Sequence, residues 1–342
     1  MSYTIALNFE DGVTRFIQCN AGEKVLDAAY RQKVNLPMDC SDGVCGTCKC
    51  HCAGGEYSLG EDYLEEALDE EEAREGQVLT CQMIPHSDCV LDVPTAAAAC
   101  KTGITAFDAT VKRVTALSES AIELVVQTTE LLHFLPGQYI NIQVPGTPHQ
   151  RAYSFSSQPG GNEGSFLIRN VPGGLMSHWL SHQASAGMPL SLTGPMGSFY
   201  LRGGERPLLM LAGGTGLAPM LAMLRTLARQ QSARQITLLY GVNRDEDLVL
   251  VDVLNDLAAR LPDFNWLPVV ADSASSCAQK GYVTEHFTST MLNEGEVDIY
   301  LCGPPPMVNG VASTLQSLGI QPAGFWYEKF IASQSAATQE RI

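Results

Sequence analysis

Apolar residues recur at every second position near the start of the chain, which predicts a short β-strand. Ile5, Leu7 and Phe9 follow this alternation, and the turn Glu10-Asp11-Gly12 leads into a second alternating segment over residues 13–19. Two alternating segments joined by a glycine-containing turn are typical of a β-hairpin. The chain therefore begins with two antiparallel strands that share one buried face.

The rest of the first hundred residues mixes helical and strand patterns. Helices are predicted over residues 24–32 and over the acidic stretch 61–75, which ends at Gly76. A short apolar segment around residues 78–81 predicts another strand. The tract PTAAAAC over residues 94–100 has no core pattern and predicts a linker. These elements indicate an α+β domain that ends before the linker.

Two further patterns follow the linker. Between residues 107 and 201, short strand-like segments return at regular intervals, with a helix predicted over 176–186, which favours a small β-barrel. From residue 207 onward, apolar strands alternate with helices, which predicts an α/β domain with a doubly wound parallel sheet. The predicted domains are residues 1–95, 106–203 and 204–335, with a linker at 96–105 and a tail at 336–342.

Size and charge add two constraints. The 342 residues exceed what one ordinary core organises, in agreement with several domains. Of the net charge of -16, residues 1–100 carry 6 Lys and Arg against 18 Asp and Glu. Such a surface repels nucleic acid and anionic membranes and attracts a partner with a basic patch. No signal peptide or long apolar run is present, so we expect a cytoplasmic protein with no nucleic-acid or membrane partner.

Cysteine is concentrated in the same acidic region, which holds nine of the eleven cysteines. Without a secretion signal, metal ligation explains this density better than disulfides. Cys40, Cys45 and Cys48 are spaced C-x4-C-x2-C, and Cys81 follows after 32 intervening residues. This spacing is typical of a plant-type 2Fe-2S cluster. Structural zinc, which also takes four thiolates, is the alternative, although zinc sites usually have two CxxC pairs and this region has one.

With this cysteine motif, the chain resembles known protein families. The first ninety-odd residues resemble plant-type ferredoxins, which implies a β-grasp fold, and the remainder resembles the flavin and nicotinamide domains of ferredoxin reductases. The segment RAYSFS at residues 151–156 matches the RxYS motif of the flavin domain, which implies a six-stranded antiparallel β-barrel. In that family, Arg151 would pair with a flavin phosphate, Tyr153 would stack on the isoalloxazine and Ser154 would hydrogen-bond near its N5. An ordinary amphipathic strand is the alternative interpretation of this segment.

A second glycine-containing segment supports a flavin site. Gly173 and Gly174 precede a predicted helix, and Ser177 lies near the start of that helix. Backbone amides at a helix N-terminus can bind an anion, and the resemblance implies that the flavin pyrophosphate lies there. Two phosphate sites favour FAD over FMN.

The α/β domain contains two motifs that follow predicted strands. The first is Gly213-Gly214-Thr215-Gly216, which leads into a helix and whose amides could hold a pyrophosphate, although it is not the GxGxxG fingerprint. The second is Cys302-Gly303-Pro304. The resemblance implies that the pair forms the nicotinamide dinucleotide site, with Cys302 and Gly303 close to the nicotinamide.

The choice between NADH and NADPH depends on the segment after the strand that ends at Gly241. Asp245 could accept the adenosine ribose hydroxyls, which favours NADH, whereas Arg244 could hold a 2′-phosphate. We expect NADH, which the family members with an N-terminal ferredoxin use. Near the C-terminus, Phe330 is the candidate for the aromatic residue that approaches the flavin ring in this family. The candidate catalytic residues are Tyr153, Ser154, Cys302 and Phe330.

Over nearly its full length, the chain resembles the reductase components of benzoate 1,2-dioxygenase-like aromatic-ring-hydroxylating dioxygenase systems. The segments PMDCSDGVCGTC, RAYSFSSQPG, GGTGLAP, EVDIYLCGPPPM and YEKF carry this resemblance. It implies electron transfer from NADH through FAD and a 2Fe-2S cluster to a Rieske non-haem iron oxygenase. It also implies that the protein is a monomer. No Rieske motif or recognisable two-histidine-one-carboxylate site is present, so we expect oxygen activation elsewhere.

Two other functions remain open from the sequence. One is a reductase for a di-iron monooxygenase of the phenol or methane type, and the other is a redox-sensing flavoprotein without turnover. His178 and His182, four residues apart on a predicted helix, could share a metal ion, but no acidic third ligand stands in a recognisable pattern. Structural or solvent-facing histidines are the preferred interpretation.

Overall fold

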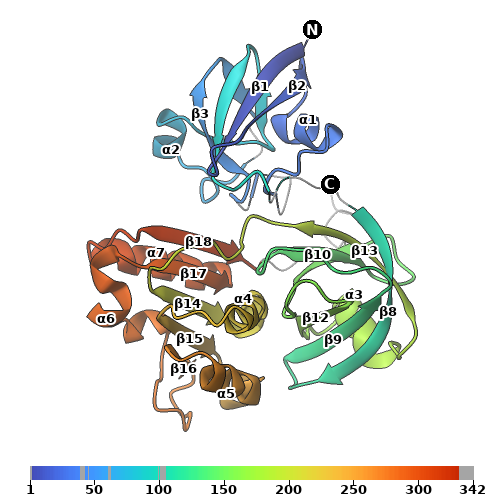
Figure 1. The fold of residues 1–342 in the computed structure, drawn as a ribbon, viewed down its shortest axis with the longest axis vertical. Helices are drawn as coiled ribbons and strands as arrows, with labels where there is room; N and C mark the ends of the chain where they lie inside the picture. Colours follow the sequence, from blue (N-terminus) through green and yellow to red (C-terminus); the bar gives the residue numbers. More distant parts are fainter. Residues whose placement is uncertain are drawn as a thin grey trace, which may run out of the picture. The chain divides into compact units, whose positions relative to one another are not determined.

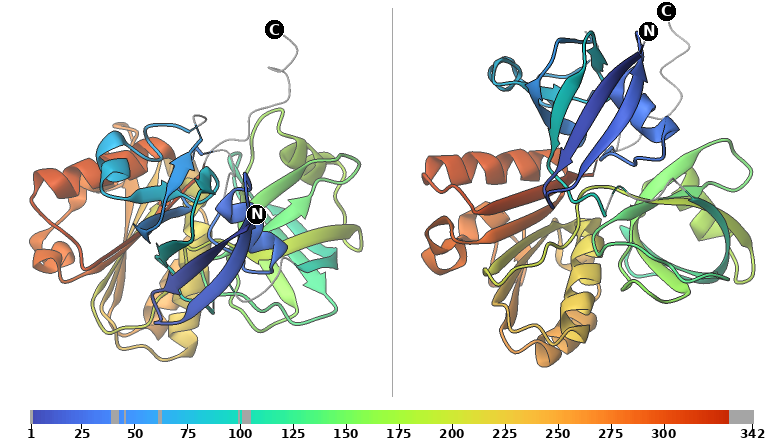
Figure 2. Two further views of the ribbon diagram at one scale, coloured as in Figure 1. Left: turned by 90° about the horizontal axis from the view of Figure 1, so that it is seen from above. Right: turned by 45° about the horizontal axis from the view of Figure 1, so that its top comes forward.

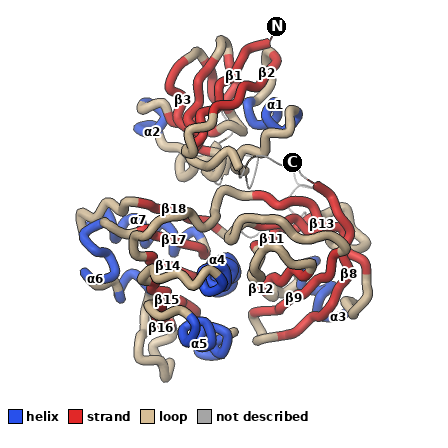
Figure 3. Tube along the Cα trace, in the orientation of Figure 1, coloured by secondary structure: helices blue, strands red, loops and turns tan. Residues whose placement is uncertain are grey.

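The computed structural model describes residues 2–38, 43–44, 46–60, 63–98, 100 and 105–330. The chain divides into two compact units, one of Met1–Ala106 with Gly194–Ser198 and the other of Phe107–Thr193 with Phe199–Ile342. Figure 1 labels the helices and strands, and Figure 3 distinguishes them from the loops. The strands form a five-stranded and a two-stranded sheet early in the chain, then a six-stranded and a five-stranded sheet.

The first unit is built on a mixed five-stranded sheet with the strand order β2-β1-β7-β3-β5. β1 and β2 form the predicted antiparallel hairpin, and β1 also pairs in parallel with β7. Ile5, Leu7 and Phe9 are buried, which confirms the predicted inward face of β1. The elements of this unit are β1 (Ser2–Phe9), β2 (Thr14–Asn20), α1 (Val25–Arg31), β3 (Lys49–Gly54), β4 (Tyr57–Leu59), α2 (Glu70–Arg74), β5 (Gln77–Leu79), β6 (Met83–Pro85) and β7 (Cys89–Val93).

The helix predicted over the acidic stretch 61–75 is shorter in the structure, where α2 begins only at Glu70. The side chain of Asp69 accepts a hydrogen bond from the amide of Glu72, and the Glu72 side chain accepts one from the amide of Asp69. This capping box stabilises the first turn of a helix and therefore fixes its start. The buried residues Ala67 and Leu68 lie in the turn just before it.

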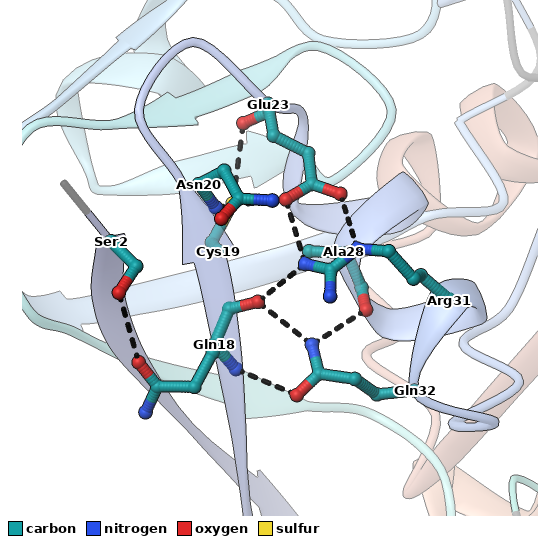
Figure 4. Close-up of polar contacts among 8 residues, drawn as sticks. All are labelled: Ser2, Gln18, Cys19, Asn20, Glu23, Ala28, Arg31 and Gln32. Carbon is teal, nitrogen blue, oxygen red and sulfur yellow. Dashed lines mark hydrogen bonds and ion pairs between the residues drawn. The ribbon is translucent and has the colours of Figure 1, made fainter.

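α1 is held against the end strand β2 by a cluster of side chains (Figure 4). The amide group of Gln32 accepts a hydrogen bond from the backbone N–H of Gln18 at 2.9 Å and donates one to its carbonyl at 2.7 Å. Arg31 pairs with both carboxylate oxygens of Glu23, at 2.9 and 2.8 Å. Gln32 thus occupies one of the backbone positions that the outer edge of β2 would offer to another strand.

The six-stranded sheet has the order β11-β10-β13-β8-β9-β12. The pairs β8/β9, β9/β12 and β10/β11 are antiparallel, as predicted. The closed barrel is not found among the described residues, because the end strands are joined only by one bridge between Phe155 and Phe166. The elements are β8 (Thr105–Ala116), β9 (Ala121–Thr128), β10 (Tyr139–Gln143), β11 (Gln150–Ser154), β12 (Glu163–Arg169), α3 (Leu175–His182) and β13 (Pro189–Met196).

The last sheet is parallel and has the order β16-β15-β14-β17-β18. Alternate residues of β14 enter two separate cores, with Met210 and Ala212 facing α4 and α5, and Leu209 and Leu211 facing α7. Helices therefore cover both faces of the sheet (Figure 2), which confirms the predicted α/β pattern. The elements are β14 (Leu208–Gly213), α4 (Leu217–Arg229), β15 (Ile236–Val242), α5 (Val251–Arg260), β16 (Phe264–Val270), α6 (Ser289–Leu292), β17 (Asp298–Gly303), α7 (Pro305–Ser317) and β18 (Gly324–Lys329).

The helices in the described part of the chain are short. α4 and α7 have 13 residues each. Within the described ranges, no helix combines the length and the apolar character that crossing a membrane requires.

Candidate functional site

Two of the four predicted cluster ligands lie in contact in the first unit. Cys48 directly precedes β3 and Cys81 follows β5, and these strands pair with Lys49 opposite Leu79. The two sulfur atoms are 3.3 Å apart, and both residues are almost completely buried. Their hydrogen bond, together with burial, raises the pKa of the Cys48 thiol well above its usual range. Cys40 and Cys45 lie outside the described residues.

The contact between Cys48 and Cys81 suits a shared metal ion. Two thiolates bound to one tetrahedral metal ion at about 2.3 Å lie roughly 3.8 Å apart, close to the observed spacing. The surrounding chain is tight, because a Cβ atom on Gly46 would lie 3.2 Å from the carbonyl oxygen of Ala67. Gly43 is held by a hydrogen bond from the amide of Leu64 to its carbonyl. This pair of sulfur donors fits both iron and zinc.

Four other cysteines of the first unit are buried in the same apolar core, and a fifth, Cys52, is half-buried beside it. Burial is the main cause that raises the pKa of each of these thiols, so they remain protonated and behave as small apolar side chains. The four buried residues are Cys19, Cys50, Cys89 and Cys100.

The two histidines of α3 form no metal site with a third ligand in the part of the chain that the structure describes. The rings of His178 and His182 stack with their centroids 4.5 Å apart, and both side chains are exposed. One ring nitrogen of His182 already contacts the carbonyl of His178 at 2.9 Å. The solvent-facing interpretation is therefore the one that the structure favours.

The predicted flavin motif lies on β11, at one end of the six-stranded sheet. Arg151 and Tyr153 share one face of the strand, where both are partly exposed. The guanidinium of Arg151 donates a hydrogen bond to the carbonyl of Gln150 at 2.8 Å. Tyr153 packs against the core of the sheet, and burial raises its pKa. Ser154 points the other way and is buried.

The predicted pyrophosphate site lies at the N-terminus of α3. Gly174 is the N-cap residue of this helix, and Gly173 before it has a φ of 74° with no atom near its missing Cβ. The Ser177 hydroxyl accepts a hydrogen bond from the amide of Val171 at 2.9 Å and donates one to the carbonyl of Arg169 at 3.3 Å. Ser177 therefore fixes the shape of the loop that presents the two glycines.

The two motifs of the α/β domain meet where the strand order of the parallel sheet reverses. β14 pairs with β17, with Ala212 opposite Cys302, so both motifs follow the carboxyl ends of adjacent strands. A Cβ atom on Gly216 would lie 2.2 Å from the carbonyl oxygen of Cys302, and one on Gly213 would lie 2.6 Å from Met307 Sδ. Side chains at these two positions would separate the motifs. Ligands of open α/β sheets bind at this kind of reversal point.

The remaining residues of these motifs border the same edge of the sheet. Gly214 and Thr215 form the short turn that leads into α4, and Gly214 has a φ of 54° with open space where a Cβ would lie. Pro304 is the N-cap residue of α7 and follows Gly303. Backbone amides at the N-terminus of α4 can therefore face an anion at this edge.

Sequence analysis missed Glu328, which joins the flavin strand to the nicotinamide motif. It lies on β18 opposite Cys302 and is only 8% exposed. One of its carboxylate oxygens accepts a hydrogen bond from the hydroxyl of Ser154 at 3.0 Å and lies 3.8 Å from the sulfur of Cys302. We refer to Ser154, Glu328 and Cys302 as the buried triad. The sequence did contain a signal for this residue. Glu328 lies two positions after Trp326, so it falls on the same face of the predicted strand, where an ionisable residue is unusual.

Phe330 also lies at this edge of the sheet. It directly follows β18, and its amide donates a hydrogen bond to the carbonyl of Gly303 at 2.9 Å. Its side chain is half-buried against the core that contains Cys302. The structure thus brings Phe330 beside the nicotinamide motif.

Asp245 follows β15 at the same edge, and its carboxylate is already hydrogen-bonded. It accepts hydrogen bonds from the Ser275 hydroxyl and, at 3.1 Å, from the amide of Ser276. These contacts, the Ser275 hydroxyl first, lower the pKa of Asp245. Arg244 is exposed, with its guanidinium 3.5 Å from Glu246. The carboxylate of Asp245, which the sequence predicts to accept the adenosine ribose hydroxyls, is therefore negatively charged and held in place.

Comparison with known domain families gives three matches along the chain. Residues 8–86 match the 2Fe-2S iron-sulfur cluster binding domain, residues 108–200 the oxidoreductase FAD-binding domain, and residues 210–313 the oxidoreductase NAD-binding domain. The protein is an oxidoreductase with iron-sulfur, flavin and nicotinamide domains in that order. The predicted cofactors, a 2Fe-2S cluster, FAD and NADH, are confirmed by these matches, which decide against structural zinc.

Relatives that match over almost their whole length show to which group of these oxidoreductases the chain belongs. The toluate 1,2-dioxygenase electron transfer component of Pseudomonas putida is 56% identical, over 97% of this chain and 100% of its own length. The 2-halobenzoate 1,2-dioxygenase electron transfer component of Burkholderia cepacia is 46% identical, over 96% of this chain and 98% of its own length. The chain belongs to the family of electron transfer components of aromatic 1,2-dioxygenases.

Solved structures agree with this assignment. A cytochrome P450 reductase from Amycolatopsis has a TM-score of 0.72 at 30% identity, over 96% of this chain and 99% of that one. The ferredoxin reductase in carbazole 1,9a-dioxygenase has a TM-score of 0.67 at 27% identity, over 97% of this chain and 99% of that one. The ferredoxin-reductase-like fold therefore extends over nearly the whole chain.

Proposed function

We propose that this protein takes electrons in pairs from NADH and delivers them singly to a Rieske non-haem iron oxygenase that dihydroxylates benzoate or a related aromatic carboxylate. When bound, the nicotinamide supplies a hydride, and the flavin and cluster pass electrons on one at a time. The relatives named for toluate and 2-halobenzoate dioxygenases support the aromatic carboxylate. The acidic first hundred residues support a partner with a basic docking surface.

We assign the three cofactors to the residues that the sequence predicted. Among the residues that the structure describes, positions on or directly after paired strands and at helix N-termini support the assignment. The cluster ligands are Cys40, Cys45, Cys48 and Cys81. The FAD-binding residues are Arg151, Tyr153, Ser154, Gly173, Gly174 and Ser177. The NADH-binding residues are Gly213, Gly214, Thr215, Gly216, Asp245, Cys302, Gly303 and Pro304.

The buried triad is the observation that best supports hydride transfer in this chain. Ser154 comes from the flavin strand and Cys302 from the nicotinamide motif, and Glu328 contacts both. Because the Ser154 hydroxyl directs its hydrogen to Glu328, its oxygen can accept a hydrogen bond from the flavin ring. All three residues are buried, so water is excluded from the contacts between them. Phe330 lies at the same carboxyl-end edge of the parallel sheet, where its amide donates to the carbonyl of Gly303.

Several finer features belong to the same proposal. The parallel pairing of β1 with β7 supports a β-grasp fold, and the Phe155–Phe166 bridge supports a barrel that closes. The two faces covered by helices support a doubly wound sheet. The use of NADH, a cofactor of the cell interior, supports a cytoplasmic protein, and the acidic first hundred residues support the absence of a nucleic-acid or membrane partner. A monomer is sufficient, because one chain carries all three cofactor sites.

The test is NADH oxidation by the full chain mixed with a purified benzoate-type terminal oxygenase, with and without benzoate. Diol product formed in step with NADH, and far less with NADPH, is the expected result. Rapid reduction of cytochrome c without benzoate turnover would remove the oxygenase assignment and keep the reductase chemistry. Bound cofactors without turnover of any acceptor would indicate a redox sensor instead.

The second candidate function is a reductase for a di-iron monooxygenase. The propane 2-monooxygenase reductase component of Rhodococcus jostii is 32% identical over 95% of this chain. The same assay with a di-iron hydroxylase in place of the Rieske oxygenase separates the two, since only the true partner supports product formation coupled to NADH.

A further inference from the structure

One buried residue beside the cysteine pair is bonded to Cys48 by two of its groups. Thr80 immediately precedes Cys81 and is fully buried. Its amide donates a hydrogen bond to the carbonyl of Cys48 at 3.2 Å, and its hydroxyl donates a second to the same carbonyl at 3.3 Å. Both donors of Thr80 therefore converge on the main chain of one cysteine.

The third polar group of Thr80 connects this pair to a helix. The Thr80 carbonyl accepts a hydrogen bond from the amide of Leu26 at 3.0 Å, in the first turn of α1. Thr80 thus joins the segment that carries Cys48, the segment that carries Cys81 and the start of α1. Each of these three segments belongs to the same apolar core.

We propose that Thr80 is a positioning residue of the iron–sulfur site, which acts by holding the main chain of Cys48 so that the sulfur atoms of Cys48 and Cys81 stay within the distance of a shared metal ion. This inference rests on the proposed ligand set. Metal binding takes the protons from the two thiols and so removes the hydrogen bond that joins them, and the main chain has to keep the two sulfur atoms at the metal-binding distance instead. The double hydrogen bond of Thr80 supplies that restraint.

The hydroxyl, rather than the volume of the side chain, is the group that the inference requires. Thr80→Val keeps the shape and the amide hydrogen bond but removes the hydroxyl, and it leaves the Cys48 carbonyl with one donor. The fold is therefore expected to survive while the restraint on Cys48 loosens. Thr80→Ser keeps the hydroxyl and removes a methyl group. Thr95→Val is the matched control, because Thr95 is equally buried and its described backbone bonds are with Glu10 and Val93.

The experiment compares the full-length parent with these three variants. Iron, acid-labile sulfide and FAD are counted per chain, cluster loss is followed by visible absorption after addition of EDTA, and the dithionite-reduced cluster is examined by EPR. Loss of a hydrogen bond around metal ligands commonly weakens metal binding by 10- to 100-fold, so cluster loss should accelerate about tenfold in Thr80→Val. Its EPR line shape should also change.

The two other variants decide whether the hydroxyl is responsible. Thr80→Ser and Thr95→Val should lose the cluster at the parental rate within about twofold, with parental EPR spectra. Equal rates in Thr80→Val and the parent would overturn the inference, and so would a Thr80→Ser variant as labile as Thr80→Val. A parent with FAD but neither iron nor sulfide would instead overturn the iron–sulfur assignment on which the inference rests.

Discussion

The cysteine pair of the first unit and the buried triad of the second are assembled in opposite ways. Cys48 and Cys81 are 33 residues apart and flank two strands that pair directly with each other. Ser154 and Glu328 are 174 residues apart and come from different sheets. The first site is a local product of one strand pair and its spacing of cysteines. The second exists only once two complete sheets have folded and met.

This contrast predicts what a substitution in each site affects. A change in the cysteine site should remove one cofactor and leave the rest of the chain folded. A change in the buried triad should alter a rate without removing either cofactor, because backbone amides and other side chains hold the flavin and the dinucleotide. The following four substitutions test this division, from the largest effect to the smallest.

Cys81→Ser should have the largest effect. Changes that only surround a metal site already cost 10- to 100-fold, so removal of a ligand should lower electron transfer to the terminal oxygenase by more than about 100-fold. The measurements are iron content and NADH-dependent product formation. Cys89→Ser, at a buried cysteine outside the predicted ligand set, should keep its iron. Full iron content in Cys81→Ser would remove this residue from the ligand set.

Glu328→Gln should slow flavin reduction by NADH by about 10- to 100-fold, because it removes the negative charge beside Ser154 and Cys302 and places an amide donor where only an acceptor stood. Stopped-flow absorbance of the flavin measures this rate. If the two residues act as one unit, Ser154→Ala should cost a similar factor and the double variant little more. Fully additive effects would show that the hydrogen bond between them has no role. Glu205→Gln, at an exposed carboxylate, is the control.

Gly216→Ala should raise the NADH concentration needed for half-maximal flavin reduction by about tenfold, since a small displacement of a binding motif has effects of this size or larger. The added Cβ would lie 2.2 Å from the Cys302 carbonyl, so the two motifs have to separate. Gly310→Ala in α7 is the matched control, because no atom lies within 4 Å of its Cβ position. It should leave the NADH requirement unchanged and raise Tm slightly. Equal behaviour of the two variants would contradict the close contact.

Asp245→Asn should have the smallest effect. The carboxylate repels a 2′-phosphate at the exposed end of β15, so its neutralisation should improve the use of NADPH relative to NADH by about fivefold. The Ser275 and Ser276 contacts lower the pKa of Asp245, which keeps the charge at acidic pH. Asp245 should therefore stay ionised through the range at about pH 6 in which a 2′-phosphate loses its second charge, and it should still discriminate against NADPH at acidic pH. Equal use of NADPH by the parent and by Asp245→Asn at pH 5 would assign the discrimination to another group.

The same contrast explains what the sequence could predict. The alternation of Ile5, Leu7 and Phe9 and the spacing of Cys48 and Cys81 are local patterns, and the structure confirms the hairpin and the sulfur contact. The predicted start of the helix over residues 61–75 was wrong. A capping box at Asp69 starts α2 at Glu70, although the acidic stretch before it has a helical pattern from residue 61. Such a box is visible in sequence, but it competes with helix propensity over the whole window.

Glu328 shows what local patterns cannot supply. Its neighbours Trp326 and Phe330 read as an apolar C-terminal strand, and only the pairing of β17 with β18 places Glu328 opposite Cys302. Its contact with Ser154 further requires the end of β11 to meet the same edge. No periodicity in the chain encodes these two contacts, since both depend on the packing of one sheet against another. The predicted barrel is a similar case, because the end strands β11 and β12 of the six-stranded sheet are linked by a single bridge and no closed barrel is found among the described residues.

The contact of Gln32 with Gln18 bears on how concentrated this protein can become. A sheet that ends in an open strand is a template on which other chains can add strands. With one side-chain amide satisfying both backbone groups of Gln18, an incoming strand cannot form its full ladder on β2. Gln32 thus blocks one position of the outer edge of β2 against the addition of a strand from another molecule.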